Sequence, residues 1–411
     1  MTATRKAIRS VTPTSSHWSH LRRSAATPAG TSLIALCAVA LAAAGACGSP
    51  PRKICFTLPS PPPVHDRQAD SVQVTFLGVG GVIVRWQGAA LLTAPLYSNP
   101  TVGEMALSEI HADRRLIDAL LREDVSGVTA ILAGHSHYDH LMDVPYVALH
   151  RATRADILGN DAMVKLLHPI EPALGGRPRP NRLVSMQRQP TYEPLDVPIR
   201  VKAILSEHSP QMGPRLINRT ARLLSWLIPL PEVTLWRGED ESDLDVLPTR
   251  VGGWPAGTPL AFVIELLDPV TRTVAFRLYY QDSPTRNPYG YPDRVSDGYD
   301  LALLTMGGAT EFRSFPGDIV KHLDPKFVMG IHWEDFFDPR KLPLPREVNR
   351  RESILYAPGV EEGKFLKAVG ESQRAGGRAM VPCPDRSATF VRGASGWEIA
   401  GDEAGWTMAK K

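Results

Sequence analysis

Residues 128–140 read VTAILAGHSHYDH, a short apolar stretch that runs directly into a histidine-rich turn. The apolar part predicts a buried strand that ends at Gly134. Four potential metal ligands follow within six residues: His135, His137, Asp139 and His140. A turn that leaves a strand can aim alternate side chains into one cleft, so the first two could bind one metal ion while the last two reach a second. A polar surface loop is the alternative, but three of the chain's twelve histidines fall in this turn.

Three further potential ligands, His208, Asp282 and His332, each lie just past a short apolar stretch. Strands are predicted at 72–77, 81–86, 90–93, 128–133, 199–205, 260–267, 273–280, 300–305 and 326–330. Helices are predicted at 104–123, 159–168 and 361–375. Strands that alternate with helices and loops indicate an α/β chain whose chemistry gathers where strands end.

The order of these residues resembles the metallo-β-lactamase superfamily, in which a His-x-His-x-Asp-His motif is followed by a lone His, a lone Asp and a final His. The resemblance covers residues 72–390 and implies an αββα four-layer sandwich with mixed β-sheets and a dinuclear metal site at one edge. It implies these ligands for the first metal ion: His135, His137 and His208. It implies these for the second: Asp139, His140 and His332. Asp282 matches the aspartate that bridges the two ions.

Other segments look most like one branch of this superfamily, which contains N-acyl-phosphatidylethanolamine-hydrolysing phospholipase D and the ascorbate-phosphate lactonases. They are Phe76-Leu77-Gly78, residues 92–98 (LTAPLYS) and Gly330-Ile331-His332-Trp333. The chain departs from that branch at Ala94, where an aspartate is usual, and at Gln281, where a glycine is usual. Loss of a carboxylate at position 94 is expected to alter ligand orientation or metal affinity. A glutamate in place of His137 would have indicated the di-iron oxidoreductase branch, and it is absent.

The ligand types and the resemblance together predict a metal-dependent hydrolase with two divalent metal ions. Histidines and carboxylates without a thiolate suit Zn²⁺, and they also allow Fe or Mn. Two such ions lower the pKa of a bridging water, so a hydroxide nucleophile is available near neutral pH, and Asp139 is the catalytic residue expected to orient it.

The substrate is expected to be a small molecule or lipid of the phosphodiester or phospholipid-like class. One alternative is a lactone, lactam or thioester hydrolase of the same fold, and another is a non-catalytic metal-binding lipoprotein. Trp333, Glu334 and Asp335, which follow the last ligand, could line the cleft. Core packing of the tryptophan and solvation of the two acids explain them equally well.

Residues 1–46 have the features of a bacterial signal peptide, with basic residues ahead of the uncharged stretch 32–44 (SLIALCAVALAAA). This stretch is too short to span a bilayer. Small residues at 44–46 precede Cys47 and resemble the bacterial lipobox, which predicts an exported envelope protein anchored to the membrane by a lipid on Cys47. An ordinary signal peptide cleaved near Ala46 would instead give a soluble secreted or periplasmic protein.

Residues 47–71 are rich in Pro and Ser, as expected of an extended tether between a lipid anchor and the hydrolase domain at 72–390. Cys55 and Cys383 could pair as a disulfide in an oxidising compartment, or remain two unrelated thiols. Residues 391–411 are expected to be a C-terminal tail.

Residues 211–255 form a longer connection than the fold needs and are predicted to be an insertion that could act as a lid. Within them, 214–227 (PRLINRTARLLSWL) combine helical spacing of leucines with a row of arginines. A basic amphipathic helix can lie on an anionic membrane or wall a lipid-binding groove. Packing on the core with the arginines in water is the alternative.

Charge argues against a nucleic-acid partner. The chain has 46 Lys+Arg and 43 Asp+Glu, a balance that leaves no dense basic face. Residues 1–46 hold five basic residues and no acidic one, so the remainder has 41 basic against 43 acidic residues. We therefore expect the membrane contact to depend on the lipid rather than on charge.

Overall fold

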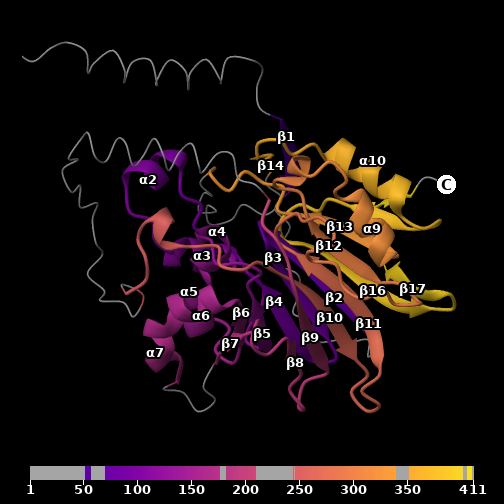
Figure 1. Ribbon diagram of the computed structural model, residues 1–411, viewed down its shortest axis with the longest axis horizontal. Helices are drawn as coiled ribbons and strands as arrows, with labels where there is room; N and C mark the ends of the chain where they lie inside the picture. Colours follow the sequence, from indigo (N-terminus) through magenta and orange to yellow (C-terminus); the bar gives the residue numbers. More distant parts are fainter. Residues whose placement is uncertain are drawn as a thin grey trace, which may run out of the picture. The chain divides into compact units, whose positions relative to one another are not determined.

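Two eight-stranded β-sheets pack against each other in the computed structural model of the chain (Figure 1). The structure describes residues 51–56, 70–175, 182–209, 244, 246–338, 351–400 and 405–409. The predicted signal peptide, Cys47 and the helix at 214–227 lie outside these ranges. Within them, no helix has both the length and the apolar character needed to cross a membrane.

The first sheet combines an antiparallel meander with parallel strands. In spatial order it consists of β17 (Gly396–Ala400), β16 (Arg386–Gly393), β2 (Ser71–Gly78), β3 (Gly81–Trp86), β4 (Ala89–Thr93), β5 (Val128–Leu132), β6 (Asp156–Gly159) and β7 (Leu183–Ser185). Strands β4 to β7 run parallel to one another, and the remaining pairs are antiparallel.

The second sheet is mixed in the same way. In spatial order it consists of β18 (Thr407–Met408), β15 (Arg378–Met380), β13 (Phe327–Ile331), β12 (Leu301–Thr305), β11 (Val274–Gln281), β10 (Leu260–Leu267), β9 (Ile199–Leu205) and β8 (Thr191–Tyr192). Its parallel strands are β11, β12, β13 and β15. The carboxyl ends of β11 and β13 therefore lie at the same edge of the sheet.

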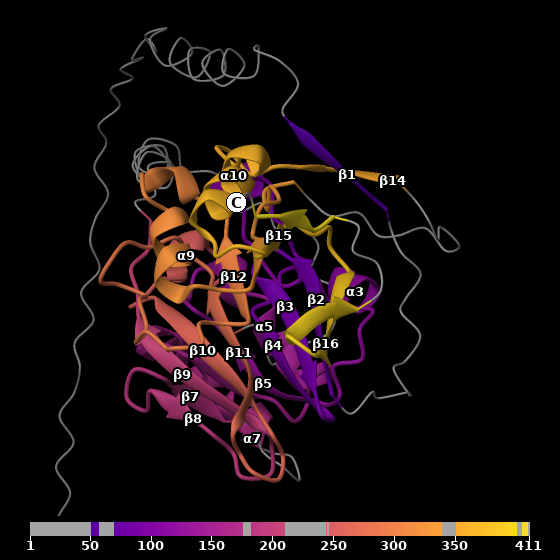
Figure 2. The ribbon, with the colours of Figure 1, turned by 90° about the vertical axis from the view of Figure 1, so that its right-hand side faces the viewer.

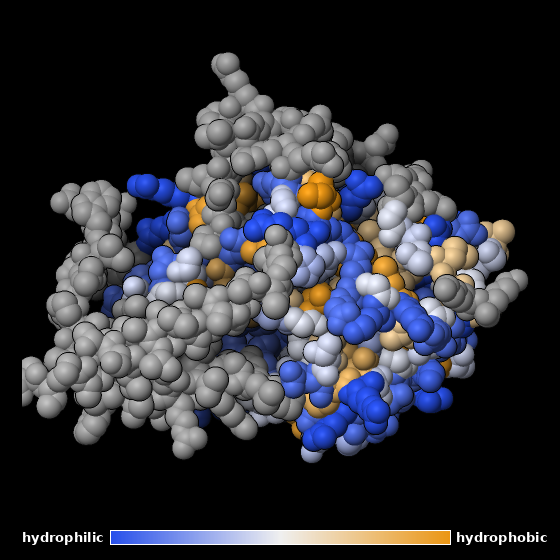
Figure 3. All heavy atoms as spheres, turned by 90° about the horizontal axis from the view of Figure 1, so that it is seen from above, coloured by the Kyte–Doolittle hydropathy of each residue, from blue (hydrophilic) through white to orange (hydrophobic). Residues whose placement is uncertain are grey.

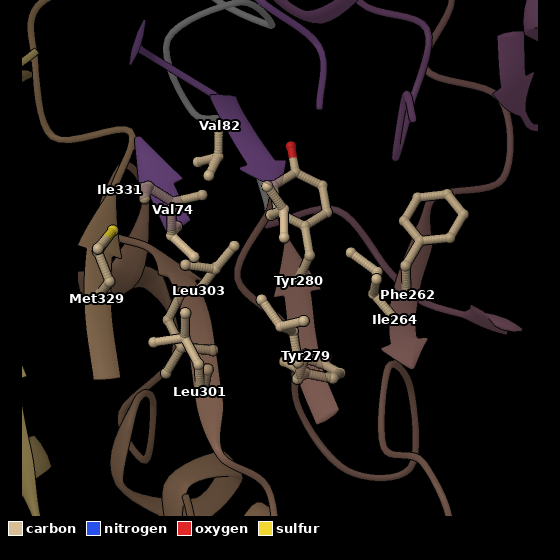
Figure 4. Close-up of a cluster of buried hydrophobic side chains, with 14 of the residues drawn as sticks. Val74, Val82, Phe262, Ile264, Tyr279, Tyr280, Leu301, Leu303, Met329 and Ile331 are labelled. Carbon is tan, nitrogen blue, oxygen red and sulfur yellow. The ribbon is translucent and has the colours of Figure 1, made fainter. Parts of the chain in front are cut away.

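Side chains from both sheets form the central core. Figure 4 shows Val74 and Val82 of the first sheet facing Tyr280, Leu303 and Met329 of the second. These residues alternate along their strands with residues that face outward, as a sheet buried on one face by another sheet requires.

Helices cover the outer face of each sheet. On the first sheet they are α3 (Arg114–Leu120), α5 (Val144–His150), α6 (Asp161–Leu167) and α7 (Glu171–Gly175). On the second sheet they are α9 (Gly317–Leu323) and α10 (Glu362–Ser372). Figure 1 shows the two groups of helices on opposite sides of the paired sheets. The predicted αββα sandwich is therefore confirmed.

A small two-stranded sheet joins the start of the described chain to its C-terminal half. Strand β1 (Arg52–Phe56) pairs antiparallel with β14 (Arg351–Leu355), beside the two large sheets (Figure 2). A disulfide joins Cys55 to Cys383, with 5.7 Å between their Cα atoms. Residues 52–56, which we expected to belong to the tether 47–71, are thus held against the domain.

The structure differs from the predicted boundaries in two further places. The single helix expected at 104–123 is two helices, α2 (Val102–Leu107) and α3, because the Asp113 carboxylate accepts the N–H groups of Arg115 and Leu116 and begins a new helix. The C-terminal tail expected at 391–411 contains β17, β18 and the end of β16, so both sheets extend past residue 390.

Part of the expected insertion at 211–255 lies within the described residues. Residues 246–255 pack on the helical side of the first sheet, where Leu247 and Trp254 are buried. The Ile110 N–H donates to the Thr249 carbonyl. This part is therefore integrated into the domain, and the prediction of a lid concerns residues outside the described ranges.

Candidate metal centre

The turn between β5 and α4 (Tyr138–Leu141) carries four of the predicted ligands. Strand β5 ends at Leu132, and His137 is the N-cap residue of α4. His135 and His137 therefore project from the turn, whereas Asp139 and His140 lie in the first helical turn. The tight succession of strand, turn and helix brings these side chains to one place.

Gly134 lets the second sheet approach this turn. A Cβ atom at this position would lie 2.4 Å from both carboxylate oxygens of Asp282, so only glycine leaves room for the aspartate. The Gly134 N–H donates to Asp282 Oδ2 at 2.9 Å. The carboxylate is thereby fixed against the backbone of the histidine-rich turn.

The other three predicted ligands come from the second sheet. His208 follows β9, Asp282 directly follows β11, and His332 directly follows β13. The His208 Nδ1–H donates to the Ser209 carbonyl at 2.8 Å, which places the lone pair of the imidazole on Nε2. All three lie at the edge of the sheet that faces the turn of the first sheet.

The seven side chains form three overlapping groups whose ligand atoms lie within 4.8 Å of one another. One group is His135, His137 and His208. A second is Asp139, His140 and His332. The third is His135, His140 and Asp282, which connects the other two. The structure thus brings together all seven residues singled out from the sequence.

Short distances link the groups. Asp282 Oδ1 lies 3.1 Å from His135 Nδ1, and Asp282 Oδ2 lies 3.5 Å from His140 Nδ1. Asp139 Oδ2 lies 3.3 Å from His140 Nε2 and 3.5 Å from His332 Nε2. The two Nε2 atoms of His140 and His332 are 3.2 Å apart. Two imidazole nitrogens and a carboxylate oxygen at such mutual distances are spaced as ligands around one cation are.

Burial is uneven across the site. Five of the seven residues are buried, whereas His137 and His208 are half-buried. The His135–His137–His208 group therefore lies nearer to solvent than the Asp139–His140–His332 group. We expect a substrate to approach from the side of His137 and His208.

Burial keeps most of the imidazoles neutral. It lowers the pKa of His135 to about 3 and that of His137 to about 4. It also lowers the pKa values of His208 and His332. Neutral imidazoles have a lone pair to offer to a metal ion, so these four side chains are ready to act as ligands near neutral pH.

The remaining titratable groups pair as ions. Burial lowers the pKa of His140, but the charges of Asp139 and Asp282 outweigh it and raise that pKa above its ordinary value. Burial raises the pKa of Asp282, but His135 and His140 outweigh it and bring the pKa to about 2. The pKa of Asp139 is likewise held well below its ordinary value, chiefly by His140. Both carboxylates are therefore ionised.

The donor set fits divalent metal ions. Among the described residues, His135 Nε2 has no hydrogen-bond partner although it is buried. Buried polar atoms without partners are rare unless an ion or water completes them. Imidazole nitrogens with two carboxylates suit Zn²⁺, Fe or Mn. The buried clusters of His and Asp thus support metal binding without identifying the metal.

Two residues that support the ligand turn were missed by the sequence analysis. Asn160, the N-cap residue of α6, accepts from Ser136 Oγ at 2.7 Å and donates to the carbonyls of Ala256 and Thr258. Asp143 is fully buried and accepts the Tyr97 and Ser98 N–H groups. The hydrogen bonds of both residues join segments far apart in the sequence, so the sequence does not indicate these pairs. The one local sign is that Asp143 follows His140 by three residues, a spacing that places two side chains on the same face of a helix.

The residues after the last ligand are now placed. Trp333 is fully buried and its Nε1–H donates to the Pro382 carbonyl, so it packs as core. Glu334 is also buried and accepts the Val79 N–H, which excludes the prediction of a solvated acid. Asp335 is half-buried.

Comparisons with known proteins find similarity only at the level of solved structures. No protein-family model matches the chain, and no curated protein matches it. The chain is similar to Igni18, a metallo hydrolase from Ignicoccus hospitalis, with a TM-score of 0.43, 13% identity and coverage of 78% of this chain and 98% of that one. It is similar to YhfI, a metallo-β-lactamase fold protein from Bacillus subtilis, with a TM-score of 0.39, 12% identity and coverage of 78% and 100%.

A possible metal-dependent hydrolase from Veillonella parvula is similar as well, with a TM-score of 0.40, 12% identity and coverage of 77% of this chain and 98% of that one. At these identities and TM-scores, the likeness carries no argument about activity. The architecture is described independently of these comparisons. Helical layers enclose two mixed eight-stranded sheets, and histidines and aspartates from both sheets meet at one edge. The described part of the chain thus has an α/β fold of αββα type, with two mixed β-sheets between helical layers.

Proposed function

We propose that the protein is a metal-dependent hydrolase with a dinuclear centre. The observation that carries this proposal is the convergence of seven ligand side chains, contributed by both sheets, in three groups with ligand atoms within 4.8 Å of one another. Two divalent ions bound there would supply a Lewis acid and an activated water. Zinc is the metal we propose first, and Fe or Mn suits the same ligands.

Three groups of residues would have different roles in the proposed reaction. Asp282 would bridge the two metal positions, because its oxygens lie near both His135 and His140. Asp139 would orient the attacking water by accepting its hydrogen bond, since a carboxylate with so low a pKa stays ionised. Neutral His137 and His208, at the more exposed side, would leave the approach of the substrate open.

Charge supports a phosphodiester or phospholipid-like substrate. The two ligand carboxylates contribute two negative charges, which is fewer than the four positive charges of two divalent ions. A centre with excess positive charge stabilises a transition state that gains negative charge on phosphoryl oxygens. Lactone, lactam and thioester hydrolysis also develops an oxyanion, so these classes belong in the same assay.

The test uses the chain from Cys47 onward, with its metals measured by elemental analysis. We expect about two metal ions per chain and hydrolysis of bis-p-nitrophenyl phosphate, with slower or no turnover of a lactone, a β-lactam and a thioester. His137→Ala should abolish turnover. His111→Ala is the matched control, because His111 is exposed and belongs to none of the three ligand groups.

Several outcomes would contradict the proposal. Full activity of His137→Ala or of chelator-treated protein would exclude the metal mechanism. Preference for the lactone, lactam or thioester would retain the hydrolase and replace the substrate class. Two bound metals without turnover of any class would favour the non-catalytic metal-binding lipoprotein.

We further propose that the protein is exported to the bacterial envelope and anchored by a lipid on Cys47. The disulfide between Cys55 and Cys383 supports an oxidising compartment. The surface visible in Figure 3 is largely hydrophilic, with apolar side chains scattered over it.

Detergent-phase partition of the full chain expressed in a bacterium tests this location. Wild-type protein should enter the detergent phase, and Cys47→Ala should move to the aqueous phase. Aqueous wild-type protein would instead favour a soluble secreted or periplasmic form.

A further inference from the structure

Two residues at the metal centre hold a backbone conformation that side chains other than glycine rarely adopt. Val79 has φ of 49° and His332 has φ of 53°. A left-handed backbone is unfavourable for residues other than glycine, and a β-branched valine is among the least suited to it. Such a conformation persists only where surrounding contacts hold it.

Hydrogen bonds link these two residues in a buried chain. The His332 N–H donates to the Val79 carbonyl at 2.9 Å, and the Val79 N–H donates to Glu334 Oε2 at 3.2 Å. Val79, His332 and Glu334 are each no more than 5% exposed. The Glu334 carboxylate therefore holds the Val79 amide, and the Val79 carbonyl in turn holds the backbone of a ligand.

The same turn also contacts the ligand His140. A Cβ atom on Gly80 would lie 2.8 Å from His140 Nδ1, so the backbone of the turn lies directly against this imidazole. The Gly80 carbonyl accepts from Tyr280 Oη at 3.1 Å and from Thr93 Oγ1 at 2.5 Å. The turn between β2 and β3 thus contacts the imidazole of His140 and the backbone N–H of His332.

We propose that Glu334 is a positioning residue for the metal ion of the Asp139–His140–His332 group. By accepting the Val79 N–H, its carboxylate holds the 78–81 turn in the left-handed conformation that presses Gly80 on His140 and the Val79 carbonyl on the His332 amide. Glu334 itself does not ligate the metal. The inference rests on the proposed metal site and is independent of the substrate.

The arrangement explains why a buried acid stands two residues after a metal ligand. Without an acceptor, the Val79 N–H would be a buried unpaired donor, which destabilises this arrangement of the turn. The turn would then relax toward an ordinary backbone conformation and move away from the His140 imidazole and the His332 backbone N–H. Loss of a group that orients metal ligands typically reduces metal affinity by roughly 10–100-fold.

The experiment compares metal binding by wild-type protein, Glu334→Ala and Glu334→Gln, without any assay of turnover. Zn²⁺ affinity is measured by competition with a chromogenic chelator, and the ligand environment is followed by the visible absorption of bound Co²⁺. Glu334→Ala should bind one of its two ions roughly 10–100-fold more weakly, with the other unchanged. Glu334→Gln keeps an oxygen acceptor of the same length and should stay within about 3-fold of wild type.

Two further variants separate positioning from a general loss of stability. Glu123→Ala removes another buried glutamate, which pairs with Arg85 near the start of β5, and should leave both affinities unchanged. Val79→Gly in the Glu334→Ala background should restore part of the lost affinity, because glycine adopts the left-handed conformation without strain. If Glu334→Ala does not fold, Glu334→Asp replaces it, since its shorter side chain withdraws the acceptor.

Each outcome decides the matter. Two ions bound by Glu334→Ala with wild-type affinities would overturn the role of Glu334, and so would equal losses in Glu334→Ala and Glu123→Ala. A wild-type protein that binds fewer than two ions would instead refute the proposed dinuclear centre. The two failures are therefore distinguishable.

Discussion

Gly134→Ala is expected to damage the metal centre while leaving the fold in place. The added Cβ would lie 2.4 Å from both Asp282 carboxylate oxygens, about 1 Å closer than the 3.4 Å at which ordinary contact begins. Gly134 is not among the glycines with positive φ, so alanine causes no backbone strain there. The clash is purely steric, and it involves the Asp282 carboxylate, which lies between His135 and His140.

The magnitude follows from that displacement. Asp282 must move by about 1 Å, and a misplacement of this size in an active site can lower turnover roughly 100-fold. Forcing an extra methyl group into a packed site costs about 1–3 kcal/mol of folding free energy. We therefore expect a folded protein with a modest loss of stability, weaker binding of both metal ions and roughly 100-fold lower kcat.

The assay measures metal content, kcat on bis-p-nitrophenyl phosphate and urea unfolding for Gly134→Ala beside Gly127→Ala. Gly127 lies just before β5, and a Cβ atom there would meet nothing within 4 Å. It therefore controls for replacing a glycine next to the same strand, at its opposite end. Wild-type metal content and kcat in Gly134→Ala would refute the view that close packing of the turn on Asp282 fixes the centre.

Three other predictions follow from the structure. Burial raises the pKa of Asp143 to about 6 from an ordinary 3.8. The folded protein binds this proton more tightly than the unfolded chain does, so the free energy of unfolding should fall by roughly 3 kcal/mol as pH rises from about 4 to about 6. Urea unfolding with chelator present measures this fall, and Asp143→Asn should lack it. Replacing Cys55 and Cys383 by serine removes a link across 328 residues and should lower the unfolding free energy by about 2–5 kcal/mol, whereas an unchanged midpoint would show that the disulfide does not form. Asn160→Ala removes the acceptor of the Ser136 hydroxyl and the two bonds donated to the part-buried carbonyls of Ala256 and Thr258, and should lower the melting temperature, measured by circular dichroism, by several degrees. Asn160→Asp should keep the acceptor for Ser136 and lose only the two donated bonds.

The convergence of the seven candidate ligands was predictable from the sequence because their signals are local. Four of them fall within six residues after an apolar stretch, and His208, Asp282 and His332 each follow another such stretch. Parallel strands bring their carboxyl ends to one edge, so residues just past those strands converge. The strand predictions for 199–205 and 260–267 agree with β9 and β10. Strand β10 is apolar except for Glu265 and is buried throughout, whereas β9 begins with buried Ile199 and Val201 alternating with basic residues.

The features that escaped prediction depend on contacts between distant residues. Strands β17 and β18 carry many exposed residues at the sheet edges, so they lack an apolar stretch and were taken for a tail. The break between α2 and α3 turns on one capping aspartate inside a periodic segment. Glu334 accepts from a residue 255 positions away, and no spacing in the sequence indicates that pair.

The candidate metal centre buries polar side chains and holds residues in backbone conformations that they rarely adopt. Five imidazoles and two carboxylates are gathered where a hydrophobic core would be cheaper, and Val79 and His332 hold a strained backbone beside them. Violations of local rules concentrate where function requires them. Because the first sheet supplies four of these ligands and the second supplies three, a metal ion bound between them would offset the unfavourable burial and link the two sheets at once. The cost of burying these groups without a metal ion is the physical argument for the proposed metal centre.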